Sequence, residues 1–161
     1  MHNGRVIVVH ALSVTGSAFV LHYLWENMQC PRFFIHTGGN VGQSAMVLAT
    51  LGDVAMTWIA QGLVAVVSKR WLWVLGPWRF RQWALLIVAA LALSFLVESW
   101  ALATSRWAYT VINPRVPGMS ISALPVAQMV LLFPLTFGLS RKIVRLAWNS
   151  NIIAGPEQKS S

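Results

Sequence analysis

Four long apolar stretches limit how this chain can fold. They cover about residues 6–28, 42–68, 83–104 and 121–139, and each is close to the roughly 20 residues that a helix needs to cross a bilayer. The chain is 57% hydrophobic and only 10% charged, whereas soluble domains carry roughly 25% charged residues. Inside hydrocarbon the backbone must satisfy its own hydrogen bonds, as a helix does. The sequence therefore predicts an all-α, four-helix transmembrane bundle.

The basic residues predict how this bundle is oriented. Four spans place both termini on one side of the membrane, together with the link between the second and third spans. The Lys and Arg residues of that side are Arg5, Lys69, Arg70, Arg79, Arg81, Arg141, Lys142, Arg145 and Lys159. The other side holds Arg32, Arg106 and Arg115. Because Lys and Arg gather in cytoplasmic loops, both termini are predicted in the cytoplasm, in a multi-pass protein of the bacterial inner membrane. The same clustering accounts for the net charge of +8 without a nucleic-acid partner.

The four spans form one predicted domain, residues 1–148, and the polar tail at 149–161 is expected to be disordered in the cytoplasm. Cys30 is the only cysteine and excludes an internal disulfide.

The link at 69–83 mixes cations with tryptophans, which predicts a segment at headgroup depth. The link after the third span contains Pro114 and Pro117 and is not expected to be one continuous helix.

Three of the four acidic residues lie inside apolar stretches. They are Glu26, Asp53 and Glu98, and the fourth, Glu157, lies in the tail. A charge at mid-bilayer costs at least ~2.5–3.5 kcal/mol, so such residues face the bundle interior and mark a proton relay, an ion path or a catalytic site. In the predicted orientation all three lie in the outer half of the membrane or at its centre. The sequence therefore predicts a polar pocket between the helices, opening toward the outer side.

His22 and Glu26 are four residues apart and share one helix face. A carboxylate beside an imidazole can orient it and act with it in proton transfer. The alternative is a polar pair that only caps the end of the helix. One His and one Glu are too few to hold a metal, and no HExxH motif is present. The sequence therefore predicts no metal and no cofactor.

Asp53 follows Gly52, with Thr50 and Thr57 nearby on the same helix. A carboxyl group at the midplane without a nearby cation is expected to be protonated or strongly hydrogen-bonded, and a neutral acid of this kind can donate a proton. The alternative is that Asp53 only bonds a neighbouring helix. Gln128, between Pro125 and Pro134, is expected either to donate into the pocket or to join helices in the same way.

Glu98 is followed by a group of aromatic and basic residues. Arg106 is near enough to fold back and pair with Glu98, while Trp100, Trp107 and Tyr109 can form a wall that stabilises positive charge. The alternative is that these rings are ordinary residues of the interfacial aromatic belt.

The stretch 94–140 resembles small integral-membrane carotenoid cyclases of the heterodimeric lycopene cyclase type, and other small membrane-embedded terpene cyclases. The resemblance rests on the order of Glu98, Trp100, Trp107 and Tyr109, on a proline-containing link and on a proline-bearing last span. It implies acid-initiated chemistry on a long isoprenoid within the bilayer, with Glu98 as a candidate acid. Those cyclases carry acidic residues shortly after a proline in a later helix, where this chain has Gln128.

Two functions fit these residues. The first is an intramembrane enzyme of the cyclase or isomerase type, which acts on a lipid or isoprenoid by acid/base proton transfer. His22 and the three intramembrane acids are its candidate catalytic residues, with Asp53 as the preferred donor and Glu98, paired with Arg106, as the ionised partner. The second is a small transporter or a non-catalytic accessory subunit, in which the acids couple ions or pair helices. A homo- or hetero-oligomer in the membrane is compatible with both.

Overall fold

The computed structural model describes residues 2–36 and 42–150, which form four long helices and a small two-stranded sheet. The elements are α1 (His2–Phe33), β1 (Phe34–His36), α2 (Gln43–Ser68), the 3-10 helix η1 (Trp73–Leu75), α3 (Phe80–Ala103), β2 (Trp107–Tyr109) and α4 (Ala123–Asn149). All four long helices are long and apolar enough to cross a membrane. The predicted all-α, four-helix transmembrane bundle is confirmed, and the chain is a multi-pass membrane protein.

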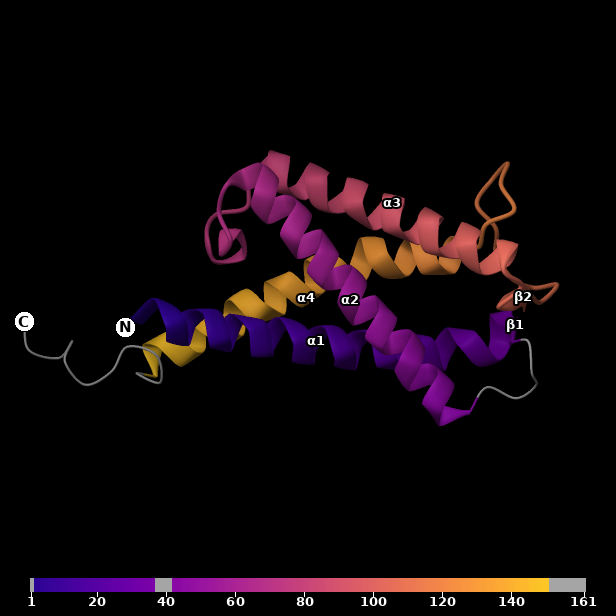
Figure 1. Cartoon of the computed structure of the whole chain (residues 1–161), viewed down its shortest axis with the longest axis horizontal. Coiled ribbons are helices and arrows are strands. Elements are labelled where there is room, and N and C mark those ends of the chain that lie inside the picture. Colours follow the sequence, from indigo (N-terminus) through magenta and orange to yellow (C-terminus); the bar gives the residue numbers. More distant parts are fainter. Residues whose placement is uncertain (1, 37–41, 151–161) are drawn as a thin grey trace, which may run out of the picture.

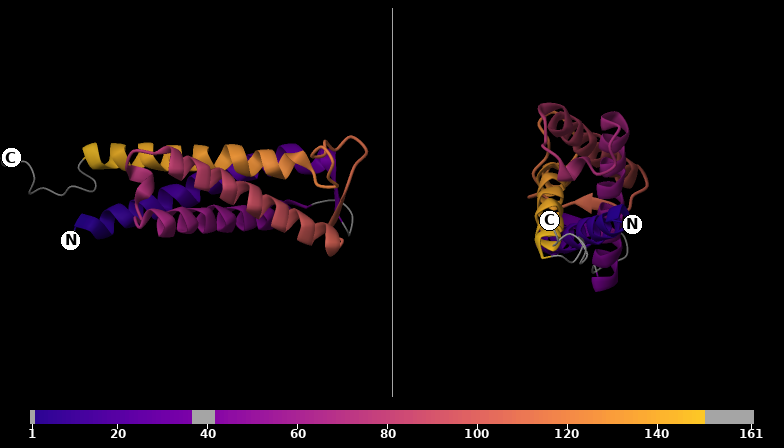
Figure 2. Two further views of the ribbon diagram at one scale, coloured as in Figure 1. Left: turned by 90° about the horizontal axis from the view of Figure 1, so that it is seen from above. Right: turned by 90° about the vertical axis from the view of Figure 1, so that its left-hand side faces the viewer.

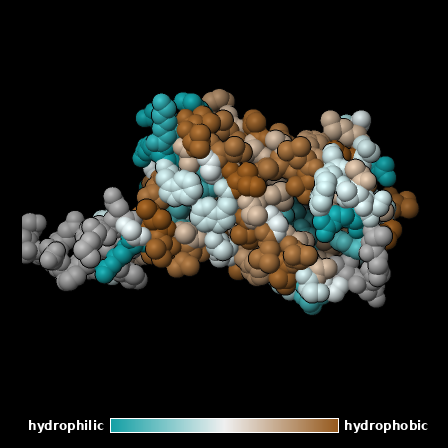
Figure 3. Space-filling view, viewed as in Figure 1, coloured by the Kyte–Doolittle hydropathy of each residue, from teal (hydrophilic) through white to brown (hydrophobic). Residues whose placement is uncertain are grey.

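The helices form an elongated bundle whose two ends differ in charge. α4 packs along α1 and α3, and α2 crosses α1 (Figures 1 and 2). The start of α1, the end of α4 and η1 lie at one end, called here the basic end, whereas β1 and β2 lie at the other, the sheet end. Hydrophobic residues cover most of the face between the two ends that Figure 3 shows. Lys159 and most of the tail predicted to be disordered lie outside the described residues.

Two helices continue past the predicted limits of their spans. α1 runs to Phe33, beyond residue 28, and α4 runs to Asn149, beyond residue 139. Hydropathy marks the part of a helix that lies in hydrocarbon, but the helix itself does not have to end there. The last turns of α4 carry Arg141, Lys142 and Arg145, and arginine and lysine are good helix formers that can reach the headgroups.

The link between α2 and α3 folds back onto the bundle. Trp73 is only 2% exposed, and its ring lies 5.4 Å from that of Phe137. Its Nε1–H donates to the backbone oxygen of Gln61, and the Gln61 side chain donates to the backbone oxygen of Trp71. The Trp73 ring therefore lies inside the bundle, where a buried carbonyl satisfies its one polar group. The headgroup depth expected for this link stays a prediction. Trp71 is half exposed.

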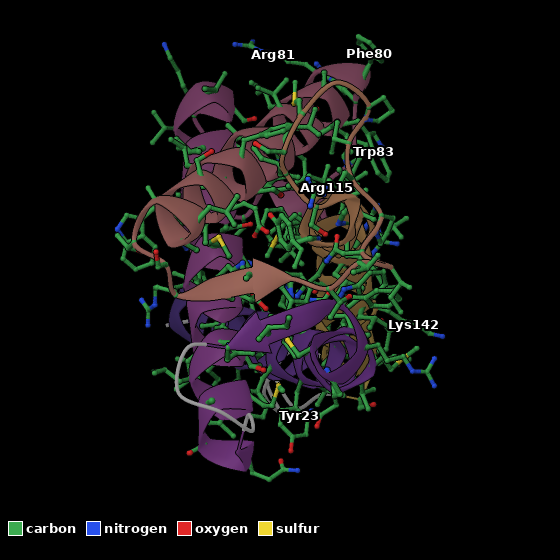
Figure 4. The ribbon with its side chains drawn as sticks, turned by 90° about the vertical axis from the view of Figure 1, so that its right-hand side faces the viewer. Tyr23, Phe80, Arg81, Trp83, Arg115 and Lys142 are labelled. Atoms are coloured by element: carbon green, nitrogen blue, oxygen red, sulfur yellow. The ribbon has the colours of Figure 1, made fainter. Side chains whose placement is uncertain are left out.

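The two strands close the sheet end, as seen in Figure 4. They pair antiparallel, with Phe34 opposite Tyr109 and His36 opposite Trp107. Ser105 adopts a left-handed conformation with φ of 54°, in the turn between α3 and β2. A left-handed residue here lets the chain leave α3 sharply and run back across the bundle end. The sheet thereby places Trp107 and Tyr109, from the link between α3 and α4, over the helices.

The charge difference between the ends yields a topology test. We expect a reporter that fluoresces only in the cytoplasm to be bright when fused after Ser161, because the basic end carries most of the cations. A reporter that is active only outside the cytoplasm should be active when inserted in the described link at residues 110–119. If the C-terminal fusion is dark although the protein is intact and inserted in the membrane, the predicted orientation is wrong.

Candidate functional site

A cavity of about 90 Å³ lies between the four helices near the sheet end. Glu26 of α1, Asp53 of α2 and Glu98 of α3 all line it, and they are 6%, 6% and 2% exposed. Most of the remaining wall is apolar and includes Met56 and Met129. Among the described residues that line the cavity there is no Lys or Arg. The structure thus brings the three intramembrane acids, each from a different helix, to one apolar space.

The amide of Gln128 in α4 joins two of these acids to a histidine. Its Nε2 lies 3.1 Å from Glu26 Oε1, 2.8 Å from Asp53 Oδ2 and 2.9 Å from His22 Nδ1. His22 is fully buried, and Gln128 is 1% exposed. We call these four residues the Gln128 cluster. Three helices contribute to it, so its geometry depends on how α1, α2 and α4 pack.

A chain of hydrogen bonds sets the direction in which the Gln128 amide points. The indole Nε1–H of Trp25, which can only act as a donor, donates a hydrogen bond to Gln29 Oε1 at 2.8 Å. The Gln29 Nε2 therefore faces the other way, toward Glu26 Oε1 and Gln128 Oε1, both at 2.9 Å. Since Gln128 accepts from Gln29 with its oxygen, its NH₂ group must face the cluster.

Thr57 sets the proton position on His22 in a similar way. The Thr57 hydroxyl donates to the backbone oxygen of Asp53 at 2.9 Å, so its oxygen is an acceptor toward His22 Nε2, 3.5 Å away. This arrangement favours the tautomer with hydrogen on Nε2 and a lone pair on Nδ1. The lone pair then lies toward the Gln128 amide and 3.4 Å from Asp53 Oδ2.

Glu98 has aromatic partners of its own, outside the Gln128 cluster. It accepts a hydrogen bond from the Tyr109 hydroxyl and one from Trp107 Nε1 at 3.4 Å. The same hydroxyl oxygen accepts from the backbone N–H of Ser122, and the Arg115 guanidinium lies over the Tyr109 ring. Burial, together with the hydrogen bond to Glu98, raises the pKa of Tyr109 above its ordinary value. Tyr109 therefore stays protonated and acts as a donor to Glu98.

Two predicted binding residues lie away from the cavity. Trp100 is 52% exposed, and the guanidinium of Arg106 lies over its ring, 4.9 Å from the centroid. Neither residue lines the cavity, whereas Trp107 and Gln128 do. Arg106 was expected to be the partner of Glu98, but the structure places it on the Trp100 face and gives Glu98 the N–H and O–H of two aromatic rings.

Three residues of the site were not singled out from the sequence. Gln29 and Cys30 follow Glu26 by three and four residues, and the Cys30 thiol donates to Glu26 Oε2 at 2.8 Å. Their spacing on the face shared by His22 and Glu26 was the signal that could have found them. His36 of β1 also lines the cavity, and burial lowers the pKa of its imidazole, which favours the neutral form.

The residues of this site are able to support proton transfer beside a positive charge. Carboxyl groups, an imidazole and a phenol can give and take protons, and ionised acids without a nearby cation attract positive charge. Among the described residues, no group of three or more His, Cys, Asp or Glu is placed to hold a metal ion.

The chain matches no protein-family model, no curated protein and no solved structure. The functional argument rests on the geometry of the cavity and on the chemistry of the residues around it.

The position of Tyr109 yields a titration test. The chain has two tyrosines, so in a Tyr23→Phe background the tyrosinate absorbance reports Tyr109 alone. We expect that absorbance to rise only above pH 10, the ordinary tyrosine value, because burial and Glu98 both favour the protonated form. Adding Glu98→Gln should move the midpoint part of the way back, since burial remains. A midpoint at or below 10, or one that ignores Glu98→Gln, would contradict the assigned partners.

Proposed function

We propose that this chain is a membrane enzyme that acts on a lipid or isoprenoid by acid/base proton transfer, as a cyclase or isomerase. The observation that carries the proposal is the meeting of three buried acids from three helices at one apolar cavity whose described lining holds no Lys or Arg. Such a site suits a reaction that begins with proton donation and passes through a carbocation. The resemblance of residues 94–140 to carotenoid cyclases implies the same kind of chemistry.

The size of the cavity favours a substrate of which only one end enters. An engineered cavity of about 150 Å³ is known to admit benzene, and this one measures about 90 Å³. A whole isoprenoid therefore does not fit, but a few carbons of its end do. Ala49 of α2 lines the cavity and is exposed on the surface, and Figure 3 shows a recess with hydrophilic atoms in the hydrophobic surface near the sheet end. The rest of the substrate would remain in the bilayer.

The acids that line the cavity would have different roles in the reaction. Asp53, held by Gln128 and His22, is the proposed proton donor. Glu98, the third acid that lines the cavity, would stabilise the carbocation and take a proton at the end. Trp107 lies beside Glu98, and an indole ring attracts a cation over its face. We place the chain in the bacterial inner membrane with both termini in the cytoplasm, so that the cavity lies in the outer half of the bilayer.

The alternative functions have less support from the geometry. A transporter needs a route to the opposite side, but Val14, Ala60 and Phe133 form a fully buried apolar layer on the basic side of the Gln128 cluster. The ring of Phe133 lies edge-on to His22, with centroids 6.3 Å apart. A second polar group, His10 with Ser140, begins only beyond that layer. An accessory subunit would be expected to turn its acids outward, whereas all three are buried.

Replacing Asp53 by Asn tests the proposed donor. The change keeps the shape and the hydrogen-bonding capacity but removes the transferable proton, and general acids typically contribute 10²–10⁴-fold in rate. Comparing lipid extracts of cells with and without the chain by mass spectrometry identifies the product. We expect Asp53→Asn to lower its formation at least about 100-fold at equal protein in the membrane. Glu157→Gln, which neutralises the acid of the tail, should keep full activity, and full activity in Asp53→Asn would remove Asp53 from the mechanism.

Enlarging Ala49 tests the route from the bilayer. Ala49→Trp places a bulky ring at a residue that both lines the cavity and faces outward. We expect product formation to fall by about 100-fold, the loss that a misplaced substrate can produce. Ala55→Trp is the matched control, because Ala55 is exposed on the same helix and does not line the cavity. Equal activity of the two variants would rule out substrate access past Ala49.

A further inference from the structure

We propose that the Gln128 cluster holds a single proton, carried by Asp53 and directed at His22, while Glu26 stays ionised and Gln128 is the positioning residue that maintains this division. The catalytic use of that proton rests on the proposed function, but its location does not. The proposal follows from counting the hydrogens that the cluster needs and comparing the donors around each acid.

The Gln128 amide cannot satisfy all of its neighbours. Three acceptor atoms lie within 3.1 Å of its nitrogen, one each on His22, Glu26 and Asp53, and an amide carries only two N–H hydrogens. Turning the amide over does not help, because Gln29 donates to its oxygen. The amide therefore donates to two of the three acceptors at a time. The remaining acceptor must receive its hydrogen from another residue of the cluster.

Glu26 is built for the ionised form. Its Oε1 faces the amide nitrogens of Gln29 and Gln128, and its Oε2 accepts from the Cys30 thiol. Hydrogen bonds to the charged form of a carboxyl group favour that form. Donors on both oxygens leave little room for a hydrogen on Glu26 itself.

Asp53 is placed to keep its proton. Its Oδ2 lies 3.4 Å from Nδ1 of His22, and the Thr57 contact leaves a lone pair on that nitrogen. Two acceptors at this distance repel each other unless a hydrogen lies between them. An O–H on Asp53 directed at His22 removes the repulsion and leaves the second lone pair of Oδ2 for the Gln128 amide.

The charge of the cavity points the same way. No Lys or Arg is among its described lining residues, so with His22 neutral and both acids ionised the cluster would carry two unpaired negative charges. Two carboxylates that share one donor group do not ionise independently, and one of them retains a proton. One proton on Asp53 leaves the cluster with a single negative charge, on Glu26.

Infrared spectroscopy of the purified protein in lipid nanodiscs tests this division, because a protonated carboxyl group has its own C=O stretching band that shifts in D₂O. At neutral pH we expect such a band in the parent protein, its loss in Asp53→Asn and its retention in Glu26→Gln and Glu98→Gln. The proposal is overturned if Glu26→Gln abolishes the band that Asp53→Asn leaves in place, or if the band is absent from the parent protein.

The role of Gln128 is tested in the same measurement. Gln128→Leu removes the donor shared by the two acids, so we expect Glu26 to take up a proton as well and a second carboxyl band to appear. Gln61→Leu, which removes a fully buried amide outside the cluster, should leave the spectrum unchanged, and circular dichroism verifies that each variant is folded. A parent-like spectrum in folded Gln128→Leu would refute the positioning role. The readout needs no substrate, so this proposal and the enzymatic one can fail separately.

Discussion

The burial of three acids at a cavity whose described lining holds no Lys or Arg is the constraint on which the rest of this structure depends. Burying an ion costs several kcal/mol even after relaxation, and a hydrogen bond involving a charged group contributes about 1.5–3 kcal/mol. The donors from Gln29, Gln128 and Cys30 around Glu26 are therefore enough to offset one charge. They cannot also offset a second charge on Asp53, which shares the Gln128 amide. The Trp25 N–H orients the amides that supply these donors, and the Thr57 contact favours the His22 tautomer that leaves a lone pair toward the cluster.

The sheet end supplies the donors for the third acid. Glu98 lies in a helix whose own backbone hydrogens are already used, and its partners Trp107 and Tyr109 come from the link after that helix. The pairing of β1 with β2 brings Trp107 and Tyr109 over Glu98, and Ser122 fixes the Tyr109 hydroxyl from a third direction. Two short strands thereby bring Trp107 into the cavity wall and Tyr109 into hydrogen-bond contact with Glu98.

The sequence was sufficient to predict the features that depend on one helix at a time. Span length and hydropathy predicted the four helices, and the cost of a charge in hydrocarbon predicted that Glu26, Asp53 and Glu98 face the interior. It was not sufficient for features that depend on contacts between distant segments. The burial of Trp73 requires the carbonyl of Gln61, a partner that the tryptophan-rich link does not indicate by itself. The partner of Glu98 was predicted to be Arg106, since charge suggests that pairing, whereas strand register decided it in favour of the aromatic residues.

The charge of the cavity also limits which end of a substrate can enter. A phosphate or carboxylate head about 4 Å from an ionised acid would be opposed by about 4 kcal/mol at an effective dielectric constant of 20. No Lys or Arg among the described lining residues compensates for that repulsion. Under the proposed function, the hydrocarbon end of an isoprenoid would meet no such barrier, and the positive charge gained on protonation would be attracted to Glu26 and Glu98. A negatively charged cavity with apolar walls would then favour the reacting state over the head group, which is the discrimination that the proposed proton-initiated reaction needs.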